Sequence, residues 1–190
     1  MFAFATVVLL AVVALWIHAM RRDPGDPSAA RSKRVHSRWL VGGGLVLPLA
    51  SVTVLLGFGI PIGHNMLPLP TGEDVVRIDV TGHQWWWEVT YPEAGVSLRD
   101  ELHIPVGVPV DVHITGGDVI HSFWVPRLGG KLDAIPGHTG VLRLRAQAPG
   151  IYRGQCAEFC GTGHAHMSFT VEAHPRPDFD AWLEAARTDD

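Results

Sequence analysis

Cysteine is scarce in this chain, and basic residues are scarce outside one short segment. The 190 residues include only two cysteines, and no C-x-x-C-H motif for attaching a haem occurs. Residues 64–190 carry 17 Asp and Glu against 9 Lys and Arg, a net charge near −8. A phosphate backbone needs a basic face, so this composition excludes a nucleic acid partner. An acidic surface recruits basic partners instead.

Charged residues are also missing from two long apolar runs. Residues 2–20 contain no Lys, Arg, Asp or Glu, and at the helical rise they span roughly 28 Å, enough to cross a bilayer once. Residues 39–62 form a second uncharged run, interrupted by the glycines at 42–44 and by Pro48, which membrane helices tolerate. The alternative for the first run is a cleaved signal peptide, but it lacks a basic n-region and a small-residue cleavage site. We expect two transmembrane helices.

The segment between the two runs sets their orientation. It contains six basic residues and only two acidic residues, Asp23 and Asp26. The basic residues are Arg21, Arg22, Arg31, Lys33, Arg34 and Arg38. Short basic loops stay on the cytoplasmic side. The pattern therefore predicts a hairpin over residues 1–63, with a cytoplasmic loop at 21–38 and both ends facing outward.

The rest of the chain is predicted to be mainly β. Residues 64–74 form a linker rich in Pro and Gly, and residues 75–175 contain short runs rich in Val, Ile, Thr and Trp. Strands are expected at 75–82, 85–91, 98–104, 109–116, 119–125, 141–147, 151–155 and 167–173. About eight strands at nearly regular spacing indicate a β-sandwich or barrel. Residues 176–190 hold a C-terminal helix, with Phe179, Trp182 and Leu183 on one face, and a tail.

One short segment concentrates soft metal ligands. Residues 155–167 read QCAEFCGTGHAHM and contain Cys156, Cys160, His164 and Met167 between two expected strands. Thiolate and thioether sulfur favour Cu(I) and imidazole also suits copper, whereas a structural zinc site would leave Met167 unused. A simple disulfide is the alternative for the cysteines, and core packing is the alternative for the methionine. A further ligand is expected from another strand, and His121, in GGDVIHSFWVP, is the best placed.

These motifs together resemble a known family. The spacing Cys156-x3-Cys160-x3-His164-x2-Met167, with His121 in a D-V-x-H-S segment, is similar to the copper A site of cytochrome c oxidase subunit II, a haem-copper oxidase subunit. The segments GHQWWW at 82–87 and KLDAIPG at 131–137 agree with it, as does the hairpin. The resemblance implies a cupredoxin-like Greek-key β-sandwich anchored by the two helices.

The resemblance also implies a set of site residues. Cys156 and Cys160 would bridge two copper ions and His121 and His164 would each bind one of them. Met167 and the backbone carbonyl of Glu158 would be weak outer ligands. The carboxylate of Glu158 would reach a magnesium ion shared with subunit I.

Three consecutive tryptophans, Trp85, Trp86 and Trp87, cannot all point to one face of a strand. Core packing is the alternative for each of them. The resemblance makes Trp85 the residue where electrons arrive from cytochrome c.

The implied function is that of the electron-accepting subunit of a terminal oxidase. It would take electrons from cytochrome c and pass them to haem in subunit I, for proton-coupled reduction of oxygen to water. The expected partners are subunit I, other oxidase subunits and the bacterial inner membrane, with the copper domain on the periplasmic side. The alternatives are a nitric oxide reductase subunit with the same copper domain and, with less support, a membrane-tethered copper chaperone. A quinol-oxidase relative would lack the copper ligands.

Overall fold

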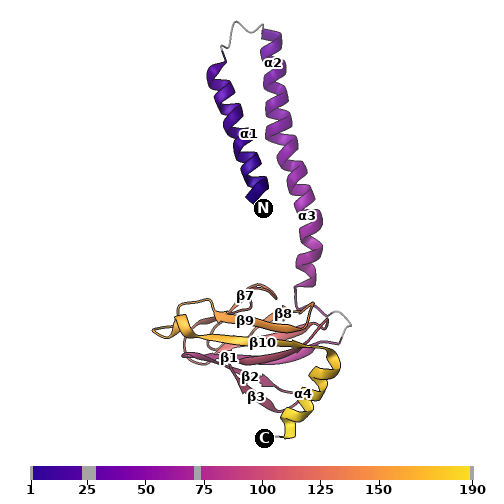
Figure 1. Cartoon of the computed structure of the whole chain (residues 1–190), viewed down its shortest axis with the longest axis vertical. Coiled ribbons are helices and arrows are strands. Elements are labelled where there is room, and N and C mark those ends of the chain that lie inside the picture. Colours follow the sequence, from indigo (N-terminus) through magenta and orange to yellow (C-terminus); the bar gives the residue numbers. More distant parts are fainter. Residues whose placement is uncertain (1, 23–28, 71–73, 189–190) are drawn as a thin grey trace. The chain divides into compact units, whose positions relative to one another are not determined.

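The computed structural model describes residues 2–22, 29–70 and 74–188. The chain divides into two compact units, residues 1–59 and 60–190. Helices make up the first unit, and strands predominate in the second (Figure 1).

The first unit is helical. It contains α1 (Phe2–Arg21), α2 (Ala29–Ser37), a π-helical segment η1 (Arg38–Val46) and most of α3 (Leu47–Asn65). The wider turn of η1 coincides with the three glycines at 42–44, and the Leu47 N–H donates to the carbonyl of Gly42, five residues back. Two helical stretches, Phe2–Arg21 and Lys33–His64, are long and apolar enough to cross a membrane.

The observed helices differ in extent from the expected ones. The second helical stretch already begins at Ala29, inside the range 21–38 that was predicted to be a loop, and α3 continues to Asn65. Residues 23–28 of that predicted loop lie outside the described residues. The basic side chains Lys33, Arg34 and Arg38 therefore lie on helix rather than on loop.

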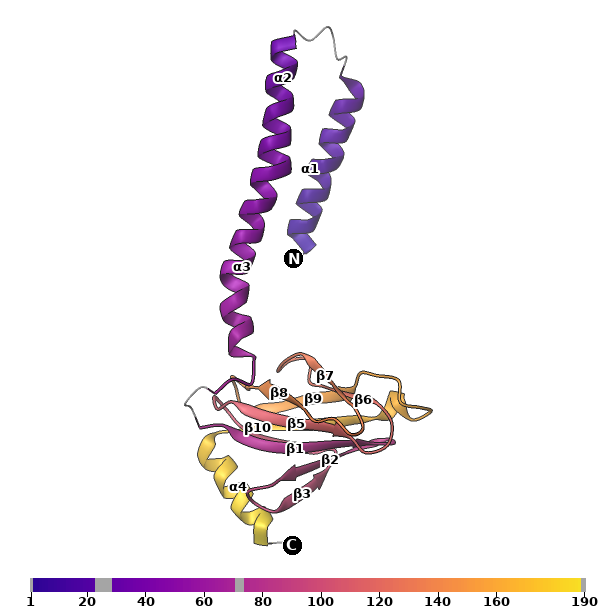
Figure 2. The ribbon, with the colours of Figure 1, turned by 180° about the vertical axis from the view of Figure 1, so that it is seen from behind.

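The second unit is a sandwich of two five-stranded sheets. Figure 2 shows its strands stacked in layers. The first sheet has the order β3-β2-β1-β5-β8, with bounds Val96–Arg99, Trp86–Tyr91, Val76–His83, Val110–Gly116 and Gly140–Leu144. The second has the order β4-β10-β9-β6-β7, with bounds Glu101–Pro105, Ser168–His174, Gly150–Cys156, His121–Trp124 and Lys131–Ala134. Both sheets are mixed, because β1 runs parallel to β5 and β10 runs parallel to β4.

Alternating apolar residues of the two sheets form the core between them. Strand β5 shows strict alternation of buried and half-buried residues, as its sequence predicts. Trp87, Phe123 and Phe169 meet at the centre, with the ring centroids of Phe123 and Phe169 4.5 Å apart. This rigid core carries the strand ends from which the ligand-bearing loops depart.

Two strand predictions were wrong. The single strand expected at 98–104 is two strands on different sheets, β3 and β4, separated at Asp100. Asp100 has φ 57°, a left-handed conformation that Asp tolerates better than most residues, and its carboxylate accepts a hydrogen bond from the Trp87 N–H at 2.7 Å. Strand β7 was not expected, because its four residues, KLDA, are too short to show a period.

The C-terminal helix α4 (Arg176–Thr188) covers one end of the sandwich, against β3, β4 and β10. Phe179 is buried and Trp182 and Leu183 pack against the core, so the predicted apolar face is the one that faces the sheets.

Candidate metal centre

The predicted ligands converge at the rim of the second sheet. His121 is the first residue of β6 and Cys156 is the last residue of β9, and these strands pair side by side. Cys160, His164 and Met167 belong to the loop between β9 and β10, which includes a short 3-10 turn at His164–His166. A hydrogen bond from the Cys156 N–H to the Met167 carbonyl, at 2.9 Å, joins the two ends of this loop.

The sulfur atoms lie close together. The Sγ atoms of Cys156 and Cys160 are 3.8 Å apart, and Cys160 Sγ lies 3.7 Å from both His164 Nδ1 and Met167 Sδ. Cys156, Cys160 and Met167 are buried and His164 is half-buried. Two thiols, an imidazole and a thioether therefore face one small space, which is a donor set suited to copper.

His121 completes the group, and its orientation is held by a carboxylate. The imidazole is fully buried, and its Nε2 lies 2.8 Å from Asp118 Oδ1. A carboxylate accepts but does not donate, so Nε2 carries the proton and Nδ1 presents a lone pair. That Nδ1 has no hydrogen-bond partner within the described part of the chain. One ligand atom from each of His121, Cys156 and Cys160 lies within 4.8 Å of the others, a group that could hold a metal ion.

The buried unpartnered nitrogen is the observation that shows a fit to a metal. A buried imidazole nitrogen without a hydrogen bond costs free energy. A metal ion beside the two sulfur atoms would satisfy it. The residues present therefore fit a copper centre.

The surroundings of the site shift the pKa of the Cys160 thiol and the pKa of the Asp118 carboxyl in opposite directions. Burial first and the neighbouring Cys156 second raise the pKa of Cys160 to about 12. Burial also raises the pKa of Asp118, but hydrogen bonds from His121 and from the N–H groups of Val119 and Gln84 outweigh it, so the net pKa is lowered. Asp118 thus stays ionised and can hold the imidazole in place.

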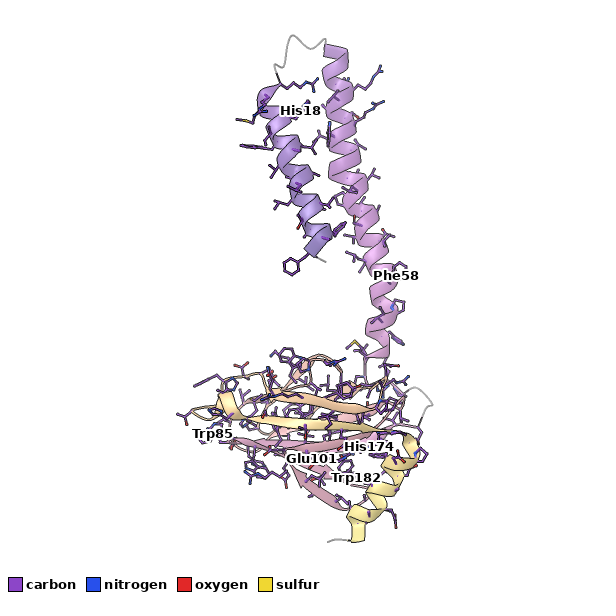
Figure 3. The ribbon with its side chains drawn as sticks, viewed as in Figure 1. His18, Phe58, Trp85, Glu101, His174 and Trp182 are labelled. Atoms are coloured by element: carbon purple, nitrogen blue, oxygen red, sulfur yellow. The ribbon has the colours of Figure 1, made fainter. Side chains whose placement is uncertain are left out.

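Trp85 lies over the same loop. The residue is 41% exposed, and its Nε1–H donates to the Cys160 carbonyl at 3.3 Å. Gln84 Nε2 donates to that carbonyl at 2.8 Å. Gly163 lies against the Trp85 ring so closely that a Cβ there would overlap it. Figure 3 shows Trp85 at the rim of the sandwich. The other two tryptophans differ: Trp87 is core, and Trp86 stacks on His83 with centroids 4.5 Å apart.

Glu158 reaches the site through its backbone. Its carbonyl accepts a hydrogen bond from the Cys156 thiol at 3.2 Å, which places this oxygen beside the sulfur atoms. Its side chain is exposed. His166, the other histidine of the loop, is exposed, whereas His164 is half-buried.

Sequence reasoning missed two residues of the site, Asp118 and Gln84. Asp118 lies within the D-V-x-H-S segment, three residues before His121, and a carboxylate so close to a candidate ligand is a readable signal. Gln84 has no such signal, because its role depends on a turn that brings residue 84 beside residue 160.

The chain is similar to subunit II of several bacterial cytochrome c oxidases. A family model described as "Cytochrome C oxidase subunit II, periplasmic domain" matches residues 94–174. The cytochrome c oxidase subunit 2 of Alkalihalophilus pseudofirmus is 37% identical over 188 residues, covering 96% of this chain and 54% of that protein. The subunit 2 of Cereibacter sphaeroides is 30% identical over 219 residues, covering 95% of this chain and 70% of that protein. This chain therefore spans about half the length of the first relative.

A solved structure gives the same result for the fold. The periplasmic domain of subunit II of cytochrome oxidase from Bradyrhizobium japonicum aligns with a TM-score of 0.59 and 32% identity, covering 63% of this chain and 97% of that one. The predicted cupredoxin-like sandwich is thereby confirmed. The two apolar helices and the match to a periplasmic domain fit a membrane-anchored protein.

Proposed function

Because this chain belongs to the cytochrome c oxidase subunit II family, we propose that it is the electron-accepting subunit of a terminal haem-copper oxidase. It accepts electrons from cytochrome c and passes them to haem in subunit I, where oxygen is reduced to water with proton translocation. The observation that carries this proposal is the convergence of two thiols, a thioether and the unpartnered His121 Nδ1 in one buried space.

Five side chains and one carbonyl would hold a pair of copper ions. Cys156 and Cys160 would bridge both ions, His121 and His164 would each bind one, and Met167 and the carbonyl of Glu158 would be the outer ligands. Bound there, the copper pair would supply a one-electron carrier. The ligands come from two adjacent strand ends and one loop on a close-packed core. Such a scaffold resists geometry change, and small reorganisation favours fast electron transfer.

Trp85 is proposed as the point where electrons arrive. Its ring is exposed to a docking partner, and its N–H is hydrogen-bonded to the backbone of Cys160, a bridging ligand in this proposal. The chain beyond residue 63 has a net charge near −8, which attracts a basic donor such as cytochrome c.

Magnesium is the second proposed cofactor. The side chain of Glu158 is exposed and is therefore available to a partner surface. It would share the magnesium ion with subunit I, since carboxylate oxygens are preferred magnesium ligands.

The proposed location is the bacterial inner membrane, crossed twice. The hairpin comprises residues 1–63, with the basic segment 21–38 in the cytoplasm. The linker 64–74, the copper domain 75–175 and the helix and tail 176–190 then lie on the periplasmic side. The charge of the segment 21–38 supports this orientation.

The two other candidates are less well supported. A thioredoxin-like copper chaperone needs alternating helices and strands, whereas the described second unit is a sandwich of ten strands and a terminal helix. A nitric oxide reductase subunit could share this copper domain, but the two relatives compared above are both cytochrome c oxidase subunits.

Oxidation of cytochrome c by the assembled oxidase tests the proposal. Cys160→Ser removes a proposed bridge and should abolish oxidation of cytochrome c, while His166→Ala, a change in the same loop, should leave the rate nearly native. Normal turnover in a Cys160→Ser complex, or a requirement for His166 with His164 dispensable, would show that the site is assigned wrongly.

A further inference from the structure

A second group of potential metal ligands lies away from the centre described above. His103 is on β4, Glu172 and His174 are on β10, and one ligand atom from each lies within 4.8 Å of the others. Met167 stands just before β10 and His174 ends it, so the two sites are separated by roughly 23 Å along the strand. Figure 3 shows Trp85 at one end of the sandwich and His174 with Trp182 at the other.

The pairing of the two strands gathers these side chains on one face. Strands β4 and β10 are parallel, with Glu172 opposite His103. Residues two apart on a strand share a face, so Glu101 and His103 on β4 lie on the same side as Glu172 and His174 on β10. Leu102 and Ile104, which alternate with them, are buried in the core. The face that carries the histidines is the one that α4 covers.

The two imidazoles are joined edge to edge. His103 Nδ1 lies 2.8 Å from His174 Nε2, and the rings are within 10° of parallel. His103 Nε2 lies 2.9 Å from Glu101 Oε1, so this nitrogen carries a proton and Nδ1 offers a lone pair. A ligating histidine usually has this arrangement, with its other N–H donated to a carboxylate.

The surroundings favour a neutral, coordinating His103. Its side chain is only 7% exposed, and burial lowers its pKa, with Glu101 offsetting part of that effect. The indole of Trp182 stacks on its ring at 3.9 Å between centroids, which fixes the plane of the imidazole. Both charged side chains that pair with the two imidazoles are carboxylates, Glu101 and Glu172. Neutral imidazole beside negative oxygen is a donor set for a divalent transition-metal ion.

We infer that His103, His174 and Glu172 form a second metal site, which binds one divalent transition-metal ion of the Zn²⁺ or Co²⁺ type. The ion takes the place of the hydrogen bond between the rings. The His174 proton moves from Nε2 to Nδ1 through solvent, which reaches this 17% exposed side chain, so the ring stays neutral. The two nitrogens separate from 2.8 Å to about 3.4 Å, the spacing that bonds of about 2.0–2.1 Å at a tetrahedral ion require.

The third ligand needs a small movement as well. Glu172 Oε1 lies 4.0 Å from His174 Nδ1, and the 41% exposed carboxylate can swing toward the rings. The bound ion would tie β4 to β10 and, through the Trp182 stack on His103, fix helix α4 against the sandwich.

Co²⁺ titration of the full chain in detergent tests this site. The titration uses a Cys156→Ser/Cys160→Ser background, so that thiolates of the first centre cannot capture the probe. We expect one Co²⁺ per chain, seen as visible d–d absorption without a thiolate band and displaced by Zn²⁺. His174→Gln and Glu172→Gln should each weaken binding by about tenfold or more, since even outer partners of a metal site act in that range. Both residues are partly exposed, so folding should survive, as far-UV circular dichroism would show.

His138→Gln is the matched control, because His138 is an exposed histidine of the same domain. Its Co²⁺ affinity should equal that of the background chain. A second readout is thermal: Zn²⁺ should raise the Tm of the background chain but not of the His174→Gln chain. Less than one Co²⁺ per chain at millimolar free ion, or binding that survives His174→Gln unchanged, would overturn the inference.

Discussion

Replacing Asp118 by Asn tests how far a residue behind the candidate metal centre controls it. The carboxylate accepts three hydrogen bonds: Oδ1 from His121 Nε2 at 2.8 Å and from the Val119 N–H at 2.6 Å, and Oδ2 from the Gln84 N–H at 2.7 Å. An amide keeps one oxygen and turns the other position into a donor. In either orientation of the amide, its NH2 group faces a hydrogen-bond donor, which is His121 Nε2–H in one orientation and the Gln84 N–H in the other.

The size of the effect follows from those contacts. A hydrogen bond to a charged group contributes about 1.5–3 kcal/mol, and each 1.4 kcal/mol changes an affinity about tenfold. If the amide nitrogen faces His121, the imidazole loses its orientation and copper affinity falls by roughly 10- to 100-fold. If the amide oxygen faces His121, the amide nitrogen faces the Gln84 N–H and that hydrogen bond is lost. The fall in copper affinity then lies at the lower end of that range.

Competition of the purified chain with a copper chelator measures this affinity. Asp133→Asn is the matched control, because Asp133 also accepts a hydrogen bond from β6, from Ser122 at 2.8 Å, but stands opposite Ser122 and not opposite His121. We expect about a twofold change or less in the control. Native copper affinity in Asp118→Asn, or an equal loss in Asp133→Asn, would refute the reasoning.

Three further predictions concern electron transfer, packing and docking. Trp85→Gln should keep the copper spectrum but severely slow reduction by cytochrome c in stopped flow; a native rate would move the point of electron arrival elsewhere. Gly154→Ala should destabilise the domain by about 1–3 kcal/mol in denaturant unfolding, because the added Cβ would overlap the Phe169 ring; an unchanged midpoint contradicts this packing. Raising ionic strength should weaken cytochrome c binding in titrations, since charges are screened beyond roughly 8 Å at physiological salt; salt-independent affinity argues against acidic steering.

The parts of the structure that local pattern determines were predictable from sequence. Apolar runs indicated the helices, alternation indicated β5, and ligand density within thirteen residues indicated the loop at 155–167. The break at Asp100 was missed. Three consecutive charged residues, Arg99 to Glu101, interrupt the alternation of residues 98–104, but the hydrogen bond from the Trp87 N–H that holds Asp100 between β3 and β4 is a tertiary contact that local pattern does not show.

The pairing of His103 with His174 could not be predicted from the sequence, because it too depends on tertiary structure. The two residues are 71 positions apart, and the parallel pairing of β4 with β10 brings them together. Neither residue stands in a motif that marks it as a ligand in the sequence. The structure instead gives His103 three specific neighbours, Glu101, His174 and Trp182.

The copper content and spectrum of the full chain test the central claim most directly. We predict two copper ions per chain, with the unpaired electron of the oxidised centre shared equally between them in electron paramagnetic resonance. Changing either Cys156 or Cys160 to Ser should abolish the shared-electron signal, because each sulfur would touch both ions. A single copper per chain, or a disulfide between Cys156 and Cys160 in the copper-loaded protein, would contradict the account.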